Sequence, residues 1–399
     1  MKQVQRGETP ALIFFKPVRL LNQVRGDNGE GTIGPTSVFI QPLTIGHSFE
    51  ITNNLSYLRS MMNRKNFLSS AGALLAASAV PSFAATDEEP AAIIPPYLRK
   101  GDMIGITSPA GYITHEEILP AVRLIESWGY RIRPGKTIGQ RDGTFGGTDT
   151  ERLADMQQML NDREIKAIMC ARGGYGSIRI IDNLQWGQFR EHPKWIIGFS
   201  DITVLHSHIL RNFGIASIHS KMCNSFPEVW EKADPVQKET IESIRRALAG
   251  EKMQYTVAAN PQNRNGTATG ILTGGNLKTL ETLAGSVSDI HTQKRILFVE
   301  DTGEYLYSID RMFWNLARTG KLRYLAGLII GGFKIKPDDP GEEFGKNLQE
   351  IVLEKVKKYN YPVCFDFPVG HQRDNFALKC GVRHKLIVQT GASTLTDRI

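Results

Sequence analysis

The segment Trp195–Leu210, WIIGFSDITVLHSHIL, is typical of a buried strand that runs into a helix, with one serine, Ser200, at the corner. The strand residues are apolar, and apolar side chains at helical spacing begin directly after the serine. Such a turn exposes a hydroxyl at the carboxyl edge of a parallel sheet, near the N–H groups that open the helix. The motif G-x-S-D leaves two interpretations: a nucleophile, or a helix cap, because Ser and Asp are favoured at helix starts.

The chain on either side of this corner alternates between strand and helix patterns. Strand patterns occur at 101–107, 165–171 and 194–200, and helical patterns at 114–130, 148–162 and 201–214, with the segment RIRPGKTI at 131–138 after the first helical pattern. The helix at 148–162 begins with Thr148 and has Glu151 three residues later, which is a capping-box pattern. This alternation predicts right-handed crossovers and a parallel sheet, and therefore an α/β domain.

The pattern changes after a helix that closes at Gly250. The next twenty residues, 250–269, are polar and rich in Asn and Gly, and we predict that they connect two domains. A chain of 399 residues is long enough for two such domains. We place the first domain at 91–249 and a smaller, mixed α/β domain at 270–399.

The N-terminal part contains the layout of a secretory signal peptide. Residues 61–84 have a basic start, an apolar stretch and small residues before a cleavage point after Ala84. The apolar stretch is short for a membrane span, so we expect no stable membrane insertion after cleavage. We predict that residues 1–60 lie upstream of the true start at Met61 or Met62, and that the protein is exported or periplasmic. If Met1 is the start, the segment is internal and a cytoplasmic location follows.

Charge and cysteine usage exclude several classes of function. The formal charge is +7, but residues 1–84 hold eight Lys or Arg and four Asp or Glu, which leaves +3 for the remainder. No basic patch with interleaved aromatic residues points to nucleic acid. None of the four cysteines has metal-ligand spacing, so we expect no metal. Cys364 and Cys380 could form a disulfide in an exported protein, or stay buried thiols like Cys170.

Three further segments carry candidate chemistry. The glycine pair in RGGYG, Arg172–Gly176, follows a strand and allows close backbone approach to a ligand, although a tight turn is the alternative. The strand in ILFVEDTGE runs into Glu300 and Asp301, so one carboxylate lies at a strand end. His371 follows Gly370 in a loop. A serine nucleophile needs a base, and the base needs an orienting acceptor, so these groups can act together.

Six ordered segments together resemble the LD-carboxypeptidase family, the serine peptidases that trim the murein tetrapeptide and have microcin-immunity hydrolases as relatives. They are GDMIGITSPAG, ARGGYGS, IIGFSDITVLH, GGNLKTL, FVEDTGE and FPVGHQRDN, and they span Gly101 to Asn375. The resemblance implies a Ser–Glu–His triad at Ser200, Glu300 and His371. It also implies a Rossmann-like or flavodoxin-like N-terminal domain, with the active site in the cleft to the second domain and no cofactor.

The resemblance assigns further roles. The backbone N–H groups of Gly174 and Asp201 are expected to form an oxyanion hole, and the murein peptide is the expected substrate. Arg172 or Arg373 could bind its terminal carboxylate, because a guanidinium fork suits that group. Asn276 and the Asp201 side chain are further candidates near the substrate. Members of the family often form homodimers.

Two other functions compete with this interpretation. One is an amide hydrolase that detoxifies a peptide-nucleotide antibiotic, as the microcin-immunity relatives do. The other is a non-catalytic periplasmic binding protein with two α/β lobes, which explains the export signal and the cleft. It does not explain why Ser200, Glu300 and His371 all fall at the family's positions.

Overall fold

The computed structural model describes residues 92–398, so the predicted extension at 1–60 and the signal segment at 61–84 lie outside the described residues. A six-stranded sheet forms the first half, in the order β11-β5-β4-β3-β1-β2. Its first five strands are parallel and run β2-β1-β3-β4-β5 across the sheet, which is the flavodoxin-like order. These strands are β1 (Met103–Thr107), β2 (Arg131–Pro134), β3 (Ile165–Cys170), β4 (Trp195–Gly198) and β5 (Ser217–His219).

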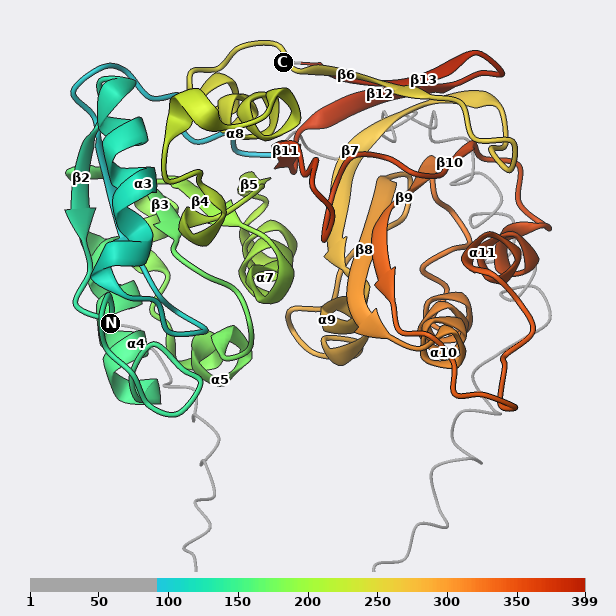
Figure 1. Ribbon diagram of the computed structural model, residues 1–399, viewed down its shortest axis with the longest axis horizontal. Coiled ribbons are helices and arrows are strands. Elements are labelled where there is room, and N and C mark those ends of the chain that lie inside the picture. The colour runs from blue at the N-terminus through green and yellow to red at the C-terminus, as the bar shows by residue number, and fades with distance from the viewer. Residues whose placement is uncertain (1–91, 399) are drawn as a thin grey trace, which may run out of the picture. The chain divides into compact units, whose positions relative to one another are not determined.

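Helices cover both faces of this sheet, as the α/β prediction requires (Figure 1). One face packs on α3 and α8, and the other on α4, α6 and α7. Thr114 and Thr148 each form a capping box, with Glu117 and Glu151, and so fix where α3 and α4 begin. The helices are α3 (His115–Ser127), α4 (Asp149–Asn161), α5 (Ser177–Ile180), α6 (Gly187–Glu191), α7 (Thr203–Phe213) and α8 (Pro235–Leu248).

The second half is a seven-stranded mixed sheet in the order β10-β9-β8-β7-β12-β13-β6. Side chains alternate along β8, so Ile296 and Phe298 face the core shared with the first domain, whereas Leu297 and Val299 face α9, α10 and α11. The strands are β6 (Gln254–Ala258), β7 (Gly266–Asn276), β8 (Ile296–Glu304), β9 (Gly327–Ile335), β10 (Val363–Cys364), β12 (Arg383–Val388) and β13 (Ala392–Asp397), and the helices are α9 (Leu277–Thr282), α10 (Leu306–Arg318) and α11 (Leu348–Val356).

The two halves are more closely joined than a simple connection would allow. Strand β11 (Leu378–Cys380) comes from the C-terminal segment, yet it pairs antiparallel with β5 of the first sheet. The predicted connection at 250–269 also differs from the structure, because it contains β6 and the start of β7, both in the second sheet. Many of its polar residues belong to strands that have one solvated face. A strand of this kind has a composition similar to that of a loop.

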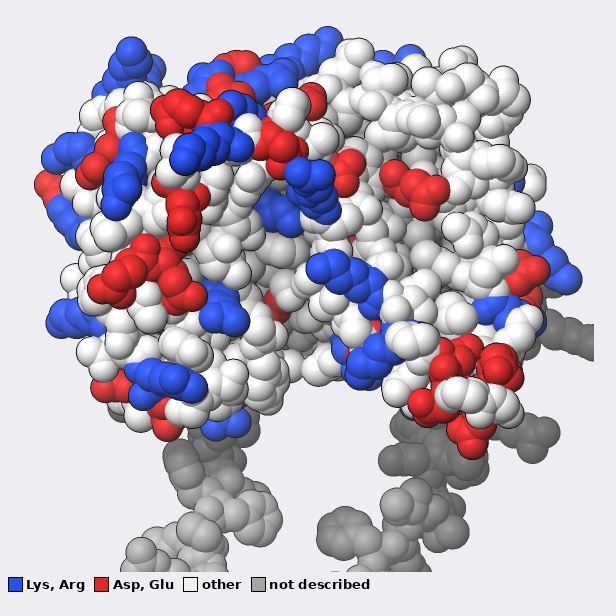
Figure 2. Space-filling model, viewed as in Figure 1, with Lys and Arg blue, Asp and Glu red and all other residues white. Residues whose placement is uncertain are grey.

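Residues 92–398 show the state of the cysteines, the hydropathy of the helices and the distribution of surface charge. All four cysteines are buried free thiols, so the alternative of a Cys364–Cys380 disulfide is wrong. No described helix is long and apolar enough to cross a membrane. Lys and Arg lie interspersed with Asp and Glu on the face seen in Figure 2, without a continuous basic surface.

Candidate active site

Ser200 occupies the corner between β4 and α7 in a strained conformation. Its φ of 62° is in the left-handed region, which costs a residue with a side chain about 1–3 kcal/mol. The serine begins a short 3₁₀ turn, Ser200–Ile202, that continues into α7, and no side-chain cap is formed at either start. The hydroxyl makes no hydrogen bond with any described residue. Ser200 therefore starts the helical segment without capping it, and the turn presents a half-buried hydroxyl.

The glycine pair predicted to approach a ligand passes directly beside this serine. A Cβ atom on Gly173 would lie 3.2 Å from Ser200 Cβ and 3.4 Å from the Phe199 carbonyl oxygen, so a side chain there would crowd the corner. Gly174 follows with φ +102°, a conformation that L residues rarely adopt. Arg152, fully buried, donates from Nη1 to the Gly176 carbonyl oxygen at 2.9 Å and so fixes the end of this loop.

Glu300 and His371 are hydrogen-bonded to each other. Glu300 Oε2 lies 2.5 Å from His371 Nδ1, and the carboxylate has no exposed surface. The close fit depends on Gly370, where a Cβ atom would lie only 2.3 Å from Glu300 Cβ. His371 is the only described residue that hydrogen-bonds this carboxylate, and Glu300 Oε1 has no partner among residues 92–398. The contact orients the ring so that Nδ1 is occupied and Nε2 is left for another group.

The histidine loop is tied to the serine corner from the first domain. The ring of His371 lies 5.0 Å from the ring of Phe199, the residue before Ser200, measured between centroids. Lys221 donates from Nζ to the Gln372 carbonyl oxygen at 2.7 Å, which links the segment after β5 to this loop. No hydrogen bond joins Ser200 to His371. Such bonds are commonly long in the absence of substrate and tighten when it binds.

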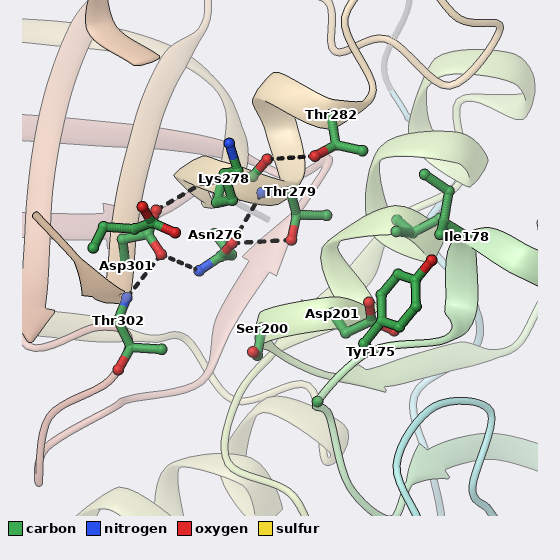
Figure 3. A pocket seen from close by; sticks show the side chains of 13 residues that line it. Tyr175, Ile178, Ser200, Asp201, Asn276, Lys278, Thr279, Thr282, Asp301 and Thr302 are labelled. Carbon is green, nitrogen blue, oxygen red and sulfur yellow. Dashed lines mark hydrogen bonds between the residues drawn. The ribbon is translucent and has the colours of Figure 1, made fainter. Parts of the chain in front are cut away.

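A pocket of about 240 Å³ opens beside Ser200 and is lined by both domains. Figure 3 shows Ser200 between Tyr175, Ile178 and Asp201 of the first domain and Asn276, Lys278, Asp301 and Thr302 of the second. The full set of lining residues is Gly174, Tyr175, Ile178, Ser200, Asp201, Val204, Asn276, Lys278, Thr279, Thr282, Asp301, Thr302 and Glu304. Four predicted site residues, Gly174, Ser200, Asp201 and Asn276, are therefore in one cavity.

The second-domain wall of the pocket is held by Asp301 and Asn276. Asn276 begins α9, accepting from the backbone N–H of Thr279 at 3.0 Å and donating from Nδ2 to Asp301 Oδ1 at 3.0 Å. Asp301 also accepts from the backbone N–H groups of Lys278 and Thr302. Burial is the main reason that the pKa of Asp301 is raised to about 6. These bonds make Asp301 a structural support of the wall.

The two domains meet closely at this point. The backbone N–H of Asn276 donates to Thr203 Oγ1 at 3.0 Å, which connects the end of β7 to the start of α7. Asp201 lies two residues earlier and accepts from the backbone N–H of Ser177 at 2.8 Å. Burial raises the pKa of the Asp201 carboxyl. The Asp201 side chain therefore holds the start of α5.

The two predicted arginines do not line this pocket. Arg172 donates to the Tyr112 carbonyl oxygen at 3.2 Å. Arg373 is 69% exposed and forms an ion pair with Asp234 at 2.6 Å. Their proposed contact with a terminal carboxylate has no support from these positions. Among the described residues, no group of His, Cys, Asp and Glu is arranged to hold a metal ion.

Several lining residues were not anticipated from the sequence. Tyr175 lies within the glycine-rich segment that we identified, and Lys278 and Glu304 lie within the segments GGNLK and EDTGE. Glu304 ends β8 and Lys278 closely follows the end of β7, whereas Tyr175 lies further along the loop that follows β3. Local patterns do not show which of several neighbouring polar residues faces a cavity.

A serine on a strained strand-to-helix turn, in an α/β fold with a glutamate-bound histidine nearby, is the arrangement found in serine hydrolases. Two family models match the chain, those of the LD-carboxypeptidase N-terminal domain at residues 104–220 and the LD-carboxypeptidase C-terminal domain at residues 269–386. The chain belongs to the LD-carboxypeptidase family and is an enzyme of the carboxypeptidase class. This confirms the predicted family and fold class, and it makes the non-catalytic binding protein the wrong interpretation.

Individual relatives agree with this assignment. A probable murein peptide carboxypeptidase of Bacillus subtilis is 32% identical over 72% of this chain and 90% of its own length. The crystal structure of muramoyltetrapeptide carboxypeptidase from Oxalobacter formigenes is 25% identical, with a TM-score of 0.66 over 74% of this chain and 99% of that one. The microcin C7 self-immunity protein in complex with aspartyl sulfamoyl adenosine shares the fold at 22% identity, with a TM-score of 0.66 over 77% and 99% of the two chains.

Proposed function

We propose that this enzyme hydrolyses the L–D peptide bond to the terminal D-alanine of murein tetrapeptides, using Ser200, His371 and Glu300 as a triad. The observation that carries the proposal is the pairing of a buried Glu300 with His371 beside the strained Ser200 corner. The murein peptide carboxypeptidases among its relatives support the substrate class.

In this mechanism His371 Nε2 takes the proton from Ser200 Oγ as the oxygen attacks the scissile carbonyl carbon. Glu300 keeps the proton on Nδ1 and stabilises the imidazolium that forms. When the C–N bond breaks, the imidazolium returns its proton to the amine of the departing D-alanine. Water then attacks the acyl-serine with His371 again acting as base, which releases the shortened peptide and regenerates the serine. The scheme uses no metal or cofactor.

The tetrahedral intermediate carries a negative oxygen that needs hydrogen-bond donors. We assign this role to the backbone N–H groups of Gly174 and Asp201, which both line the pocket with Ser200. Arg152 and the contact between the Gly111 N–H and the Gly173 carbonyl oxygen, 2.9 Å, hold the loop in place. Donors fixed before the reaction starts are effective, and the loss of one typically costs about 100- to 1000-fold in rate.

Release of free D-alanine tests the proposed function. The purified protein is incubated with a murein tetrapeptide, with the matching tripeptide as a control, and with an aminoacyl sulfamoyl adenosine. We expect D-alanine from the tetrapeptide, no hydrolysis of the tripeptide, and little hydrolysis of the nucleotide. Cleavage of the nucleotide alone would favour the microcin-immunity-like alternative, with which the chain shares its fold. Absence of turnover on all three would contradict the proposal.

We also propose that the chain is exported through the segment at 61–84, as its layout predicts. Mass spectrometry of the mature protein from the native cell should then find Ala85 at the N-terminus, in a periplasmic or extracellular fraction. A cytoplasmic protein that retains Met1 would contradict the export proposal without affecting the catalytic one. Homodimer formation stays a prediction.

A further inference from the structure

The loop that carries His371 is held by a buried asparagine. Asn375 has no exposed surface, and its Oδ1 accepts the backbone N–H of Gly370 at 2.8 Å. Gly370 directly precedes His371, has φ +101°, and lies so close to Glu300 that no side chain would fit between them. The hydrogen bond from Gly370 to Asn375 therefore fixes the point at which the chain passes Glu300 and turns into His371.

A buried histidine of the first domain lies next to this asparagine. His219 ends β5, has no exposed surface, and packs edge-to-face on Phe199 and Phe298, with centroid distances of 5.8 and 5.0 Å. Neither ring nitrogen of His219 has a hydrogen-bond partner of ordinary geometry among residues 92–398, and the same is true of Asn375 Nδ2. Buried polar groups without a partner are rare and call for an explanation.

His219 is held in its neutral form. Burial lowers the pKa of His219 well below its ordinary value, and the nearby His206, His371 and Lys221 lower it further, whereas a hydrogen bond with the Asn375 side chain acts in the opposite direction. This hydrogen bond is a weak one, because it falls outside ordinary geometry. A neutral imidazole has one nitrogen that accepts, so His219 can take an Nδ2 proton of Asn375. The amide oxygen of Asn375 is then turned toward the loop.

We propose that Asn375 is a positioning residue for His371, and that His219 orients the Asn375 amide from across the domain boundary. The inference rests on the proposed function, because His371 is the base of the proposed triad. Asn375 acts through Gly370, whose place sets how the His371 ring meets its carboxylate. The rings of His219 and His371 both pack on Phe199, the residue before the serine, so the contact also ties the base to the serine corner.

The test measures the rate of D-alanine release and the melting temperature of variants at Asn375. Asn375→Ala removes the acceptor for the Gly370 N–H. We expect kcat to fall by about 10- to 100-fold with KM little changed, because the base is displaced while the pocket walls stay in place. Asn375→Asp has nearly the same shape and keeps an acceptor oxygen, so it should recover part of the rate. Asn375→Leu fills the space without an acceptor and replaces Asn375→Ala in the test if that variant does not fold.

Asn347→Ala is the matched control. Asn347 also accepts a backbone N–H, that of Glu350 at 2.9 Å, but it begins α11 and does not line the pocket. Its loss should lower the melting temperature and leave kcat unchanged. An unchanged kcat in Asn375→Ala, or the same loss of rate in the control, would overturn the positioning role. Asn375→Asp with no more activity than Asn375→Ala would overturn it as well.

The variant His219→Phe tests the proposed partner of Asn375, because phenylalanine is similar in size and has no ring nitrogen. Two residues that act through one contact give losses that do not add. The double variant His219→Phe/Asn375→Ala should therefore lose no more rate than Asn375→Ala alone. Additive losses would overturn the role of His219.

A proton NMR signal separates failure of this inference from failure of the proposed function. The Nδ1 proton of His371, which lies in the 2.5 Å contact with Glu300, should resonate far downfield without substrate and disappear in Glu300→Gln. If the wild-type enzyme releases no D-alanine, the proposed function fails, and this signal still reports on the loop. Its loss in Asn375→Ala but not in Asn347→Ala would keep the positioning role. Its persistence without change in Asn375→Ala would overturn that role.

Discussion

Ser200→Ala is expected to lower kcat for D-alanine release by about 10⁴-fold or more, the scale seen when a serine peptidase loses its nucleophile. The described lining of the pocket offers no replacement, since its other hydroxyls belong to threonines and a tyrosine and not to the strained corner. KM should change little, because the pocket walls stay intact. A coupled assay with D-amino acid oxidase measures the rate.

A second variant separates chemistry from folding. Ser200 has φ 62°, which glycine adopts without strain, so Ser200→Gly should be equally inactive and raise the free energy of unfolding by about 1 kcal/mol. Ser127→Ala, at an exposed serine at the end of α3 whose hydroxyl donates only to the Leu124 carbonyl oxygen, should leave the rate unchanged and should not raise the free energy of unfolding. D-alanine release that persists at the wild-type rate in Ser200→Ala would show that Ser200 is not the nucleophile.

The parallel half of the fold could be predicted because its signals are local. Strands β1, β3 and β4 and helices α3, α4 and α7 are each marked by apolar residues at the matching spacing, and a capping box fixes the start of α4. The short helices α5 and α6 have no such run and were not predicted. The carboxyl ends of parallel strands meet at one edge. That rule places Ser200 and the loop at 172–176 together, and Gly173 does pack on Ser200.

The parts that could not be predicted depend on contacts between distant segments. Strand β11 has only three residues, and nothing in LKC shows that it pairs with β5 about 160 residues earlier. The segment at 250–269 has the composition of a loop, but its pairing with β12 and β13 makes it sheet. The outer wall of the pocket has the same origin, because Glu304 and Lys278 lie on different elements. Only the folded chain shows that both face the cavity with Ser200.

Glu300→Gln is expected to lower kcat by about 10³- to 10⁴-fold while leaving the side-chain volume almost unchanged. Glu300 Oε2 accepts the Nδ1–H of His371, and this leaves Nε2 without a proton and able to act as base. A glutamine can turn its NH₂ group toward Nδ1, which favours the tautomer protonated at Nε2. That tautomer cannot accept the serine proton. The imidazolium formed during attack also loses the buried negative charge that stabilises it, because Glu300 has no exposed surface.

The assay compares Glu300→Gln with Glu300→Asp and with Glu342→Gln, all at saturating tetrapeptide. Aspartate keeps the charge but shortens the side chain by one methylene, so it should restore part of the lost rate. Glu342→Gln removes a remote surface charge and should retain full activity. Among the described residues, His371 alone hydrogen-bonds the Glu300 carboxylate. If Glu300 had only a structural role, the order of activity of the two variants would be reversed. Glu300→Gln, whose side chain is closer in size and shape to glutamate, would then be more active than Glu300→Asp. That order would contradict the assignment of Glu300 to the triad.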